Sequence, residues 1–426
     1  MKITNAQSWV ALDSRGEATV AVKLTSNEHS SVVVAPAGAS TGGKEIPVIR
    51  DGASRNYPDT LTTKVVKKFN TELAKELINK SPESIDDLLD QIDGPAAQTK
   101  YGTHVMTATS VASNLLAAKV NNLEPYNFFA QQLNETATLP MPMVNIVSGA
   151  AHAQGAIDIQ DILCIPNGAS SFSESIHMAN QVRRKAKELM QKEGFNSGLI
   201  ADEGGLAANF DSNRAAIALV TRAIKESGYE PLKEVSIAID FAANQFLTND
   251  NKYNLTREGV TIDGVKLAQL INSWVDEFPI ISIEDPIAED DEAGWQEVAK
   301  LLRDKIQVIG DDRFATDADL VEAAIERNDA NSVLVKPNQT GTLKRARKSL
   351  SLAKAANWTT VVSARSGETE DSWLADLATG WNAGQIKVGS TMRSERTAKW
   401  NRLLELEATT DLSFATGSVF KNVVNK

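Results

Sequence analysis

Cysteine is nearly absent from this chain of 426 residues, which contains one, Cys164. A single cysteine cannot form an internal disulfide and is typical of a reducing compartment, so we expect a cytoplasmic location. Long apolar runs are absent as well: no stretch of about 18 consecutive apolar residues occurs, and the first residues contain no apolar signal core. The sequence therefore predicts a soluble protein without a membrane span.

Basic residues are fewer than acidic ones: the chain has 44 Lys and Arg and 55 Asp and Glu, which give a net charge of −11. Such a balance disfavours binding to nucleic acid or to an anionic membrane surface. A local group of cations or metal ions can still reverse the field at one place. We therefore expect no nucleic-acid partner, whereas a small anionic substrate remains compatible with the composition.

Two types of organisation follow one another along the chain. Residues 1 to about 60 alternate β-rich segments with turns, and residues 61–132 carry helical patterns, which together describe an α+β domain. The segment 133–142 has two prolines and little periodicity. Beyond it, strands alternate with helices. We therefore place an amino-terminal α+β domain at residues 1–135 and a second domain at residues 136–426.

Seven apolar, β-branched segments in the second half of the chain run directly into an ionisable residue. Such runs are typical of buried parallel strands, where charge is costly, and we expect all seven to be strands, including residues 199–203. The residues at their ends are Glu203, Asp240, Glu284, Asp311, Lys336, Arg365 and Lys387. The carboxyl ends of such strands share one mouth. We therefore predict an α/β barrel enzyme, rather than an open sheet.

Three of these tips are carboxylates on consecutive predicted strands, namely Asp240, Glu284 and Asp311. Oxygen ligands from separate rigid strands are what Mg²⁺ prefers, with water or substrate completing its coordination. The alternative for any one carboxylate is a helix cap or a pair with a neighbouring base. Because three follow one another and lysines come next, the sequence predicts a Mg²⁺ site.

Two further tips, Lys336 and Lys387, end strands that are otherwise too apolar for a surface. A lysine with an ordinary pKa of about 10.4 is a poor base at neutral pH, but nearby cations and loss of solvation lower that pKa. Mg²⁺ and a second lysine would supply such cations. The alternative is a structural salt bridge to the acidic tips.

A glycine-rich segment from Gly38 resembles a phosphate-binding P-loop up to Lys44. That motif requires Ser or Thr next, to hold Mg²⁺, whereas this chain has Glu45, so we reject the P-loop interpretation. A mobile loop that closes over a site fits better. His152 is a lone histidine of the kind that is usually structural. Glu203 is a stronger candidate, because the glycines after it let a ligand approach the backbone.

Seven short motifs together resemble those of the enolase family (phosphopyruvate hydratase). They are Gly38-Ala-Ser-Thr-Gly42, Asp202-Glu-Gly-Gly205, Ser282-Ile-Glu-Asp285, Gly310-Asp-Asp312, Lys336-Pro-Asn-Gln339, Arg365-Ser-Gly-Glu-Thr369 and Gly384-Gln-Ile-Lys387. The resemblance implies an amino-terminal α+β domain followed by a modified eight-stranded α/β (TIM-like) barrel whose first strands are irregular. It also implies reversible, Mg²⁺-dependent dehydration of 2-phospho-D-glycerate to phosphoenolpyruvate in glycolysis, and a homodimer or higher homo-oligomer.

The resemblance also implies roles for individual residues. Lys336 would be the base that removes the C2 proton, and Glu203 the acid that assists departure of the C3 hydroxyl. Two Mg²⁺ ions would be held by oxygen ligands, which are Asp240, Glu284, Asp311 and Ser40. The substrate would be bound by polar groups around the mouth, which are His152, Gln160, Asp161, Arg365, Ser366 and Lys387.

The chain departs from the family pattern on the side of the leaving group. Ala364 stands where enolases have histidine, and Asp161 where they have glutamate, one methylene longer. Smaller departures are Ala37, Ser148-Gly-Ala150 and Thr103-His-Val105. Acid–base assistance by one side chain contributes roughly 10²–10⁴ in rate. We therefore predict an enolase that keeps metal and substrate binding but turns over slowly.

Two alternatives remain open at this stage. One is a different enolase-superfamily dehydratase acting on a related phospho-acid, although Arg365 and Ser366 favour retained phosphate recognition. The other is a non-catalytic homologue displayed at the cell surface as a plasminogen receptor. Lys426 is a carboxy-terminal lysine of the type such receptors use, whereas residues 246–253 lack the charges expected of an internal plasminogen site.

Overall fold

The computed structural model describes residues 1–39, 42–51, 62–93 and 100–421. The amino-terminal part begins with an antiparallel sheet in the order β1 (Asn5–Leu12), β2 (Ala18–Ser26) and β3 (His29–Val34). Helical segments follow, which are α1 (Thr63–Lys68), a π-helical turn (Phe69–Leu73), α2 (Ala74–Leu77), a 3₁₀ turn (Pro82–Ser84), α3 (Ile85–Ile92), α4 (Gly102–Val120) and α5 (Pro125–Leu133). Strands followed by helices make the α+β arrangement that the sequence predicts.

The rest of the chain forms a closed barrel of eight strands. Around the barrel they are β10 (Ile280–Glu284), β11 (Gln307–Gly310), β12 (Ser332–Val335), β13 (Thr359–Ser363), β14 (Gly384–Gly389), β5 (Met141–Ser148), β6 (Asp161–Ile165) and β7 (Ser236–Asp240). Strand β6 runs antiparallel to both of its neighbours, whereas all other pairs are parallel. The predicted α/β barrel with irregular first strands is confirmed.

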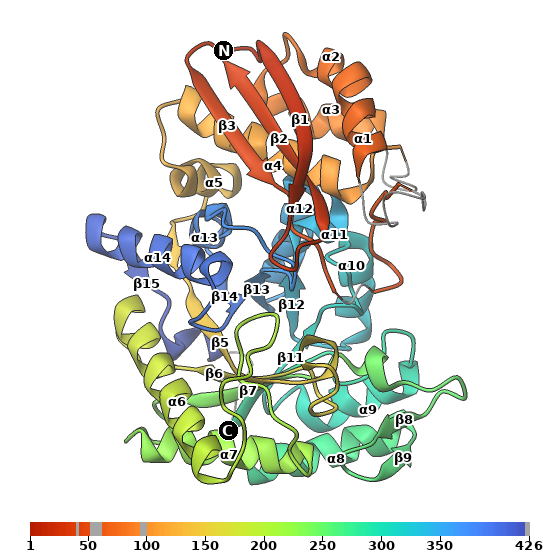
Figure 1. Cartoon of the computed structure of the whole chain (residues 1–426), viewed down its shortest axis with the longest axis vertical. Helices are drawn as coiled ribbons and strands as arrows, with labels where there is room; N and C mark the ends of the chain where they lie inside the picture. The colour runs from red at the N-terminus through yellow and green to blue at the C-terminus, as the bar shows by residue number, and fades with distance from the viewer. Residues whose placement is uncertain (40–41, 52–61, 94–99, 422–426) are drawn as a thin grey trace.

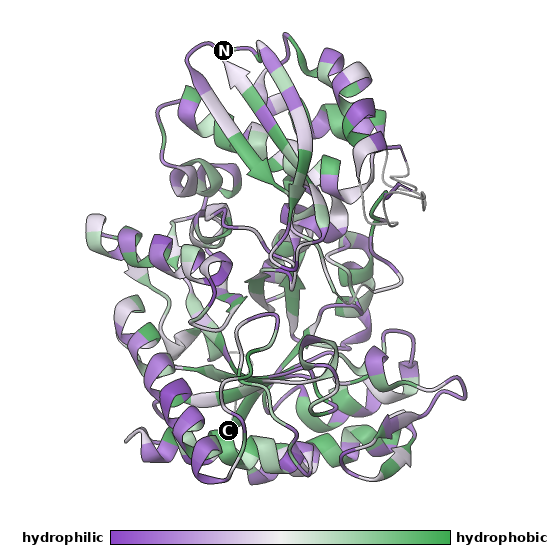
Figure 2. Cartoon of the chain, in the orientation of Figure 1, coloured by the Kyte–Doolittle hydropathy of each residue, from purple (hydrophilic) through white to green (hydrophobic). Residues whose placement is uncertain are grey.

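Helices wrap the barrel and turn their apolar faces to its strands (Figures 1 and 2). They are α6 (Phe172–Lys192), α7 (Asn213–Glu226), α8 (Gly264–Glu277), α9 (Glu292–Leu302), α10 (Ala318–Arg327), α11 (Pro337–Thr340), α12 (Leu343–Ala355), α13 (Trp373–Gly380) and α14 (Ser394–Thr409). Most of the long ones start at a side-chain cap, as where Asp263 accepts the N–H of Lys266 at the start of α8. Short pairs of strands, β4 (Thr138–Leu139) with β15 (Ser413–Phe414) and β8 (Tyr253–Leu255) with β9 (Val260–Ile262), lie outside the barrel.

The inside of the barrel is closely packed where the strands begin, and Gln307 donates there to Ser332, Thr359 and Gln385. A cluster of buried side chains fills it, made of Met141, Met143, Leu163, Ile165, Ala238, Ile281, Ile309, Leu334, Val361 and Phe420. Burying these side chains stabilises the barrel and leaves no aqueous channel through it. The ionisable residues lie at the opposite ends of the strands, above this packed layer.

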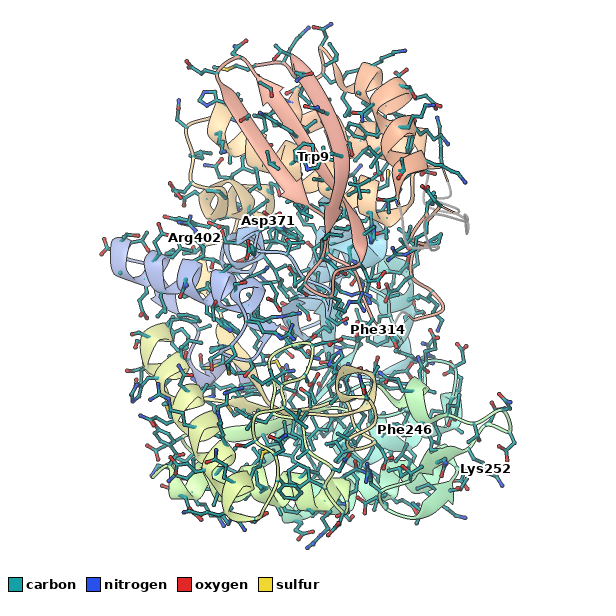
Figure 3. The ribbon with its side chains drawn as sticks, viewed as in Figure 1. Trp9, Phe246, Lys252, Phe314, Asp371 and Arg402 are labelled. Atoms are coloured by element: carbon teal, nitrogen blue, oxygen red, sulfur yellow. The ribbon has the colours of Figure 1, made fainter. Side chains whose placement is uncertain are left out.

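The two domains pack against each other at that face. Helix α4 is buried along nearly its whole length between the amino-terminal sheet and the barrel. Asp371 accepts the backbone N–H of Val34 at 2.8 Å, and Arg402 pairs with Glu124 at 2.8 Å (Figure 3). These contacts lie on one side of the junction. They fix the amino-terminal domain over the mouth of the barrel.

One predicted strand is not a strand. Residues 199–203 form a turn-rich segment, which pairs only through the isolated bridge between Ile200 and Leu206. Leu199 is 53% exposed and Ile200 37% exposed, so this apolar run is not part of the core. The segment folds back at Gly204, whose φ of +85° favours glycine. Glu203 therefore reaches the site from a loop rather than from a strand end.

The buried face of α8 gives a stability prediction with a matched control on the same helix. Leu267 is fully buried, whereas Leu270, one turn further, is only partly buried. Leu267→Ala should lower the free energy of unfolding by about 2–5 kcal/mol, because it removes buried methyl groups and leaves a cavity. Leu270→Ala should cost clearly less. Urea unfolding measures both, and equal losses would contradict this packing.

Candidate active site

The predicted tip residues converge at the mouth of the barrel. Six of them are almost fully buried, with exposed fractions of 7% for Glu203, 2% for Asp240, 1% for Glu284, 7% for Asp311, 3% for Arg365 and 5% for Lys387. Lys336 follows β12 and has a side chain that is 13% exposed. Charged groups are buried in proteins only when they are paired or hold a ligand. The mouth therefore holds a group of charges that must neutralise one another.

Lys387 lies between two of the predicted metal ligands. Its Nζ donates to Asp240 at 2.6 Å and to Glu284 at 2.7 Å. Burial lowers the pKa of this lysine, but the two carboxylates outweigh it and raise the pKa well above its ordinary value. Gln160, just before β6, donates to Asp240 at 2.9 Å. The second oxygen of Glu284, Oε1, is buried without a hydrogen-bond partner among the described residues.

Lys336 makes the second ammonium–carboxylate contact, with Asp311 Oδ2. The other oxygen of Asp311 accepts a hydrogen bond from Gln339 at 2.9 Å. Burial lowers the pKa of Lys336, but the nearby Asp311 carboxylate outweighs it and raises that pKa, which is opposite to the lowered pKa that the sequence leads us to expect. The two lysines thus lie side by side with the acidic tips, as cations that neutralise them.

Two carboxylates that the sequence interpretation missed complete this acidic group. Asp285 accepts the backbone N–H groups of Asp311 at 2.9 Å and of Asp312 at 2.6 Å. Ligand oxygens of these three residues lie within 4.8 Å of one another. Burial and the neighbouring carboxylates raise the pKa of Asp285 well above its usual range and that of Asp312 to about 7. The Glu284-Asp285 and Asp311-Asp312 dipeptides were the available signal.

The donor set fits a divalent cation. Asp240, Glu284 and Asp311 present carboxylate oxygens from three neighbouring strand ends, and Glu284 Oε1 is a buried acceptor with no donor among the described residues. Hard oxygen donors of this type suit Mg²⁺ better than soft metals. Ser40, the fourth predicted ligand, lies outside the described residues.

The glycine-rich loop of the amino-terminal domain reaches the same mouth. Glu45 accepts hydrogen bonds from both terminal guanidinium nitrogens of Arg365, at 3.0 Å each, and Arg365 also donates to Asn338 at 2.9 Å. Ser366 accepts the backbone N–H of Ala39 at 2.5 Å. Burial lowers the pKa of Arg365, but Glu45 outweighs it and raises that pKa. Glu45, the residue that rules out a P-loop, therefore binds the Arg365 guanidinium in the way that an anionic ligand would.

On the opposite side, three predicted residues form a second polar group. His152 lies on a 3₁₀ turn (Ala150–Ala153), and Asp161 is the first residue of β6. His152 Nδ1 lies 3.0 Å from Asp161 Oδ2, and its Nε2 lies 3.8 Å from Glu203 Oε1. Ser148 donates to the other oxygen of Asp161 at 2.5 Å, and Asn145 donates to Glu203 at 3.2 Å.

The position of the missing imidazole is part of the same mouth. Ala364 follows β13, and its N–H donates to the carbonyl of Lys387 at 2.9 Å. Its methyl group is 6% exposed, next in the chain to Arg365. The backbone that would present an imidazole is therefore in place, whereas the ring is absent.

The fold and this site define a class of protein, an α/β-barrel enzyme whose acidic, lysine-containing mouth is covered by a second domain. Family models agree: "Enolase, N-terminal domain" matches residues 3–129, and "Enolase, C-terminal TIM barrel domain" matches residues 136–422. A protein named enolase from Wolinella succinogenes is 37% identical over 410 residues, covering 95% of this chain and 96% of the relative. Another enolase, from Helicobacter hepaticus, is 36% identical over 416 residues, covering 96% and 97%.

The chain belongs to the enolase family. The predictions of this family, of its fold and of a phosphopyruvate hydratase, a hydro-lyase, are confirmed. Membership implies use of a divalent metal and a phospho-acid substrate, and the acidic groups at the mouth could hold such a metal. Among the residues that the structure describes, no helix has the length and apolar character needed to cross a bilayer.

The contact of Lys387 gives a prediction about stability. In chelator-containing buffer, Lys387→Met should lower the free energy of unfolding by about 3–5 kcal/mol, because Asp240 and Glu284 lose the cation between them. Lys233→Met is the control, since that lysine pairs with Glu230 at the exposed surface. Denaturant titration measures both, and a Lys387→Met protein as stable as the control would contradict the argument.

Proposed function

We propose that this chain catalyses the Mg²⁺-dependent, reversible dehydration of 2-phospho-D-glycerate to phosphoenolpyruvate. The observation that supports this most directly is the burial of three carboxylates, two lysines and an arginine in one mouth. This substrate carries a carboxylate and a phosphate, and a mouth of mixed charge can hold both. A cytoplasmic location, a homo-oligomeric state and a domain division at 135/136 are part of the same proposal.

Asp240, Glu284 and Asp311 would hold one Mg²⁺, and Ser40 would hold a second. Bound Mg²⁺ supplies positive charge that stabilises the doubly negative ene-diolate produced when a proton leaves carbon next to a carboxylate. A lysine base paired with Mg²⁺ is a general catalytic pattern of enolase-superfamily sites.

The anion-binding residues divide between the two ends of the substrate. Arg365 and Ser366 would bind the phosphate, which would take the place of Glu45 on the guanidinium. Gln160 and Lys387 would hold the carboxylate. Both ends are then fixed by residues whose own positions are set by strand ends and by hydrogen bonds. Such positioning lowers the entropy cost of reaching the transition state.

Lys336 and Glu203 would move the protons. Lys336 Nζ lies at a strand end beside Asp311 and, once it has lost its own proton, would accept the C2 proton. Glu203 comes from the loop on the other side of the mouth and would assist departure of the C3 hydroxyl. Two groups that approach from opposite sides can remove a proton and a hydroxyl from adjacent carbons. Ala364 leaves the hydroxyl side without one imidazole, so we propose reduced turnover.

The activity itself is the first test. The chain supplied with 2-phosphoglycerate and Mg²⁺ should form phosphoenolpyruvate, and chelation of the metal should abolish the reaction. Lys336→Met should lower kcat by roughly 10²–10⁴, as expected for loss of an acid–base group. Lys348→Met, which changes an exposed lysine paired with Asp319, is the matched control. Absence of product from the native chain, or full activity of Lys336→Met, would refute the proposal.

Ala364 gives the second test of function. Ala364→His should raise kcat, because it returns a proton-carrying ring to a backbone position that is already at the mouth. Ala364→Leu adds comparable bulk without ring nitrogens and should not raise it. Steady-state kinetics on 2-phosphoglycerate decides between them. A native chain as fast as Ala364→His would show that the missing ring does not limit turnover.

A further inference from the structure

Four buried side chains follow one another on the leaving-group side of the mouth, with hydrogen bonds joining the first three and Glu203 within ion-pair distance of His152. Ser148 Oγ donates to Asp161 at 2.5 Å, and the other oxygen of Asp161 lies 3.0 Å from His152 Nδ1. The far ring nitrogen, Nε2, faces Glu203 Oε1 at 3.8 Å. The exposed fractions of the His152, Asp161 and Glu203 side chains are 4%, 0% and 9%. Water therefore has little access to this line.

The backbone fixes both ends of the line. Ser148 packs so closely on Gly205 that a Cβ there would lie 2.2 Å from the Ser148 hydroxyl oxygen. This contact leaves the hydroxyl directed at Asp161. The turn that carries His152 is held by Gln245, which accepts the N–H of Ala151 at 2.8 Å. The ring itself is oriented by its contact with Asp161.

The charges along the line make His152 a cation and Glu203 a carboxylate in the resting protein. Burial lowers the pKa of His152, but Asp161, Glu203 and Asp240 outweigh it and raise that pKa to about 9. Burial raises the pKa of Glu203, but the positive charges of His152, Arg396 and nearby lysines outweigh it and lower that pKa. Both pKa directions favour the proton on His152 rather than on Glu203 before the substrate reacts.

We propose that His152 supplies this proton through Glu203, and that Asp161 and Ser148 are positioning residues that hold the ring for the transfer. The inference rests on the proposed dehydration. It assigns to Ser148 and Asp161, two positions where the chain departs from the family pattern, a common task. A carboxylate one methylene shorter than glutamate stays against β6, where it meets both the Ser148 hydroxyl and the His152 ring.

The protons of this dehydration step balance without any further reactant. Lys336 takes the proton from C2, and the C3–O bond breaks with its electron pair on oxygen. A proton passes from His152 Nε2 to Glu203 and from Glu203 to that oxygen, which leaves as water. The Nδ1 proton of His152 stays on the ring, hydrogen-bonded to Asp161, throughout. After product release, solvent returns one proton to His152 and takes one from Lys336.

A metal ion is the competing use of His152, Asp161 and Glu203, because their ligand atoms lie within 4.8 Å of one another. A ring whose Nδ1 donates to Asp161 cannot ligate through that nitrogen, and a protonated ring cannot ligate at all. The protonation state of the His152 ring therefore distinguishes metal binding from proton transfer.

The first experiment observes that state directly, in full-length protein without substrate. Histidine labelled with ¹⁵N gives few signals, since the chain has four histidines, and His152→Gln identifies the signal of His152. Both ring nitrogens should carry protons at neutral pH. Asp161→Asn should give a neutral ring, and Asp158→Asn, on the same approach to β6, should not. A neutral ring in the native chain, or no change in Asp161→Asn, would overturn the inference.

The second experiment separates proton transfer from binding. His152→Gln should lower kcat by roughly 10²–10⁴ with little change in KM. Ser148→Ala and Asp161→Asn should lower kcat in the same direction. Activity needs the protonated ring, so it should fall as pH rises through about 9. In Asp161→Asn the fall should begin at lower pH, because the carboxylate that favours the cation is gone.

The third variant tests the connection to Ala364. Ala364→His should raise kcat by a larger factor in the His152→Gln protein than in the native chain, because only the former lacks a proton-carrying ring. A rise in KM with unchanged kcat in His152→Gln would overturn the inference and leave the proposed function intact. Failure of the native chain to form phosphoenolpyruvate would instead remove the proposed function.

Discussion

The buried contact of Lys387 with Asp240 and Glu284 is the interaction on which the mouth of this barrel depends. Three strands bring these groups together, and none of the three charges could stay in so buried a place alone. The apolar cluster toward the other end of the strands packs the barrel beneath this contact and stabilises the fold that holds the three charges. Charge balance at one end and close packing at the other thus specify a single set of strand partners.

The parts of the fold that the sequence predicts are those decided by local pattern. Apolar runs ending in a charge identify β7, β10, β11, β12, β13 and β14, because a strand buried on both faces leaves that signature. The same pattern fails at residues 199–203, where an apolar run lies partly at the surface and turns back at Gly204. Periodicity reports which residues are apolar, whereas pairing depends on partners distant in sequence.

The candidate site shows the same limit at the level of side chains. Single charges at strand ends were found, but Asp285 and Asp312, the second members of two acidic pairs, were not. From the sequence, Glu45 is only the residue that stands where a P-loop needs a hydroxyl. In the structure it binds Arg365 across the two domains. Ser148 was noted as a departure without a role, since its partner Asp161 becomes its neighbour only through the antiparallel pairing of β5 and β6. Tertiary pairing, not residue type, gives these residues their place.

The two halves of the mouth differ in how they treat charge. On the lysine side, Lys387 contacts both Asp240 and Glu284, and Lys336 contacts Asp311, so the carboxylates outnumber the ammonium groups and a divalent cation would add positive charge there. On the histidine side, one imidazole lies between two carboxylates and, in the proposed step, carries the proton. A methyl group at position 364 takes nothing from the first half. In the proposed reaction its effect falls on the second half, where the only ring among the described residues of that line is His152, so turnover would depend on the hydrogen bonds that hold this ring.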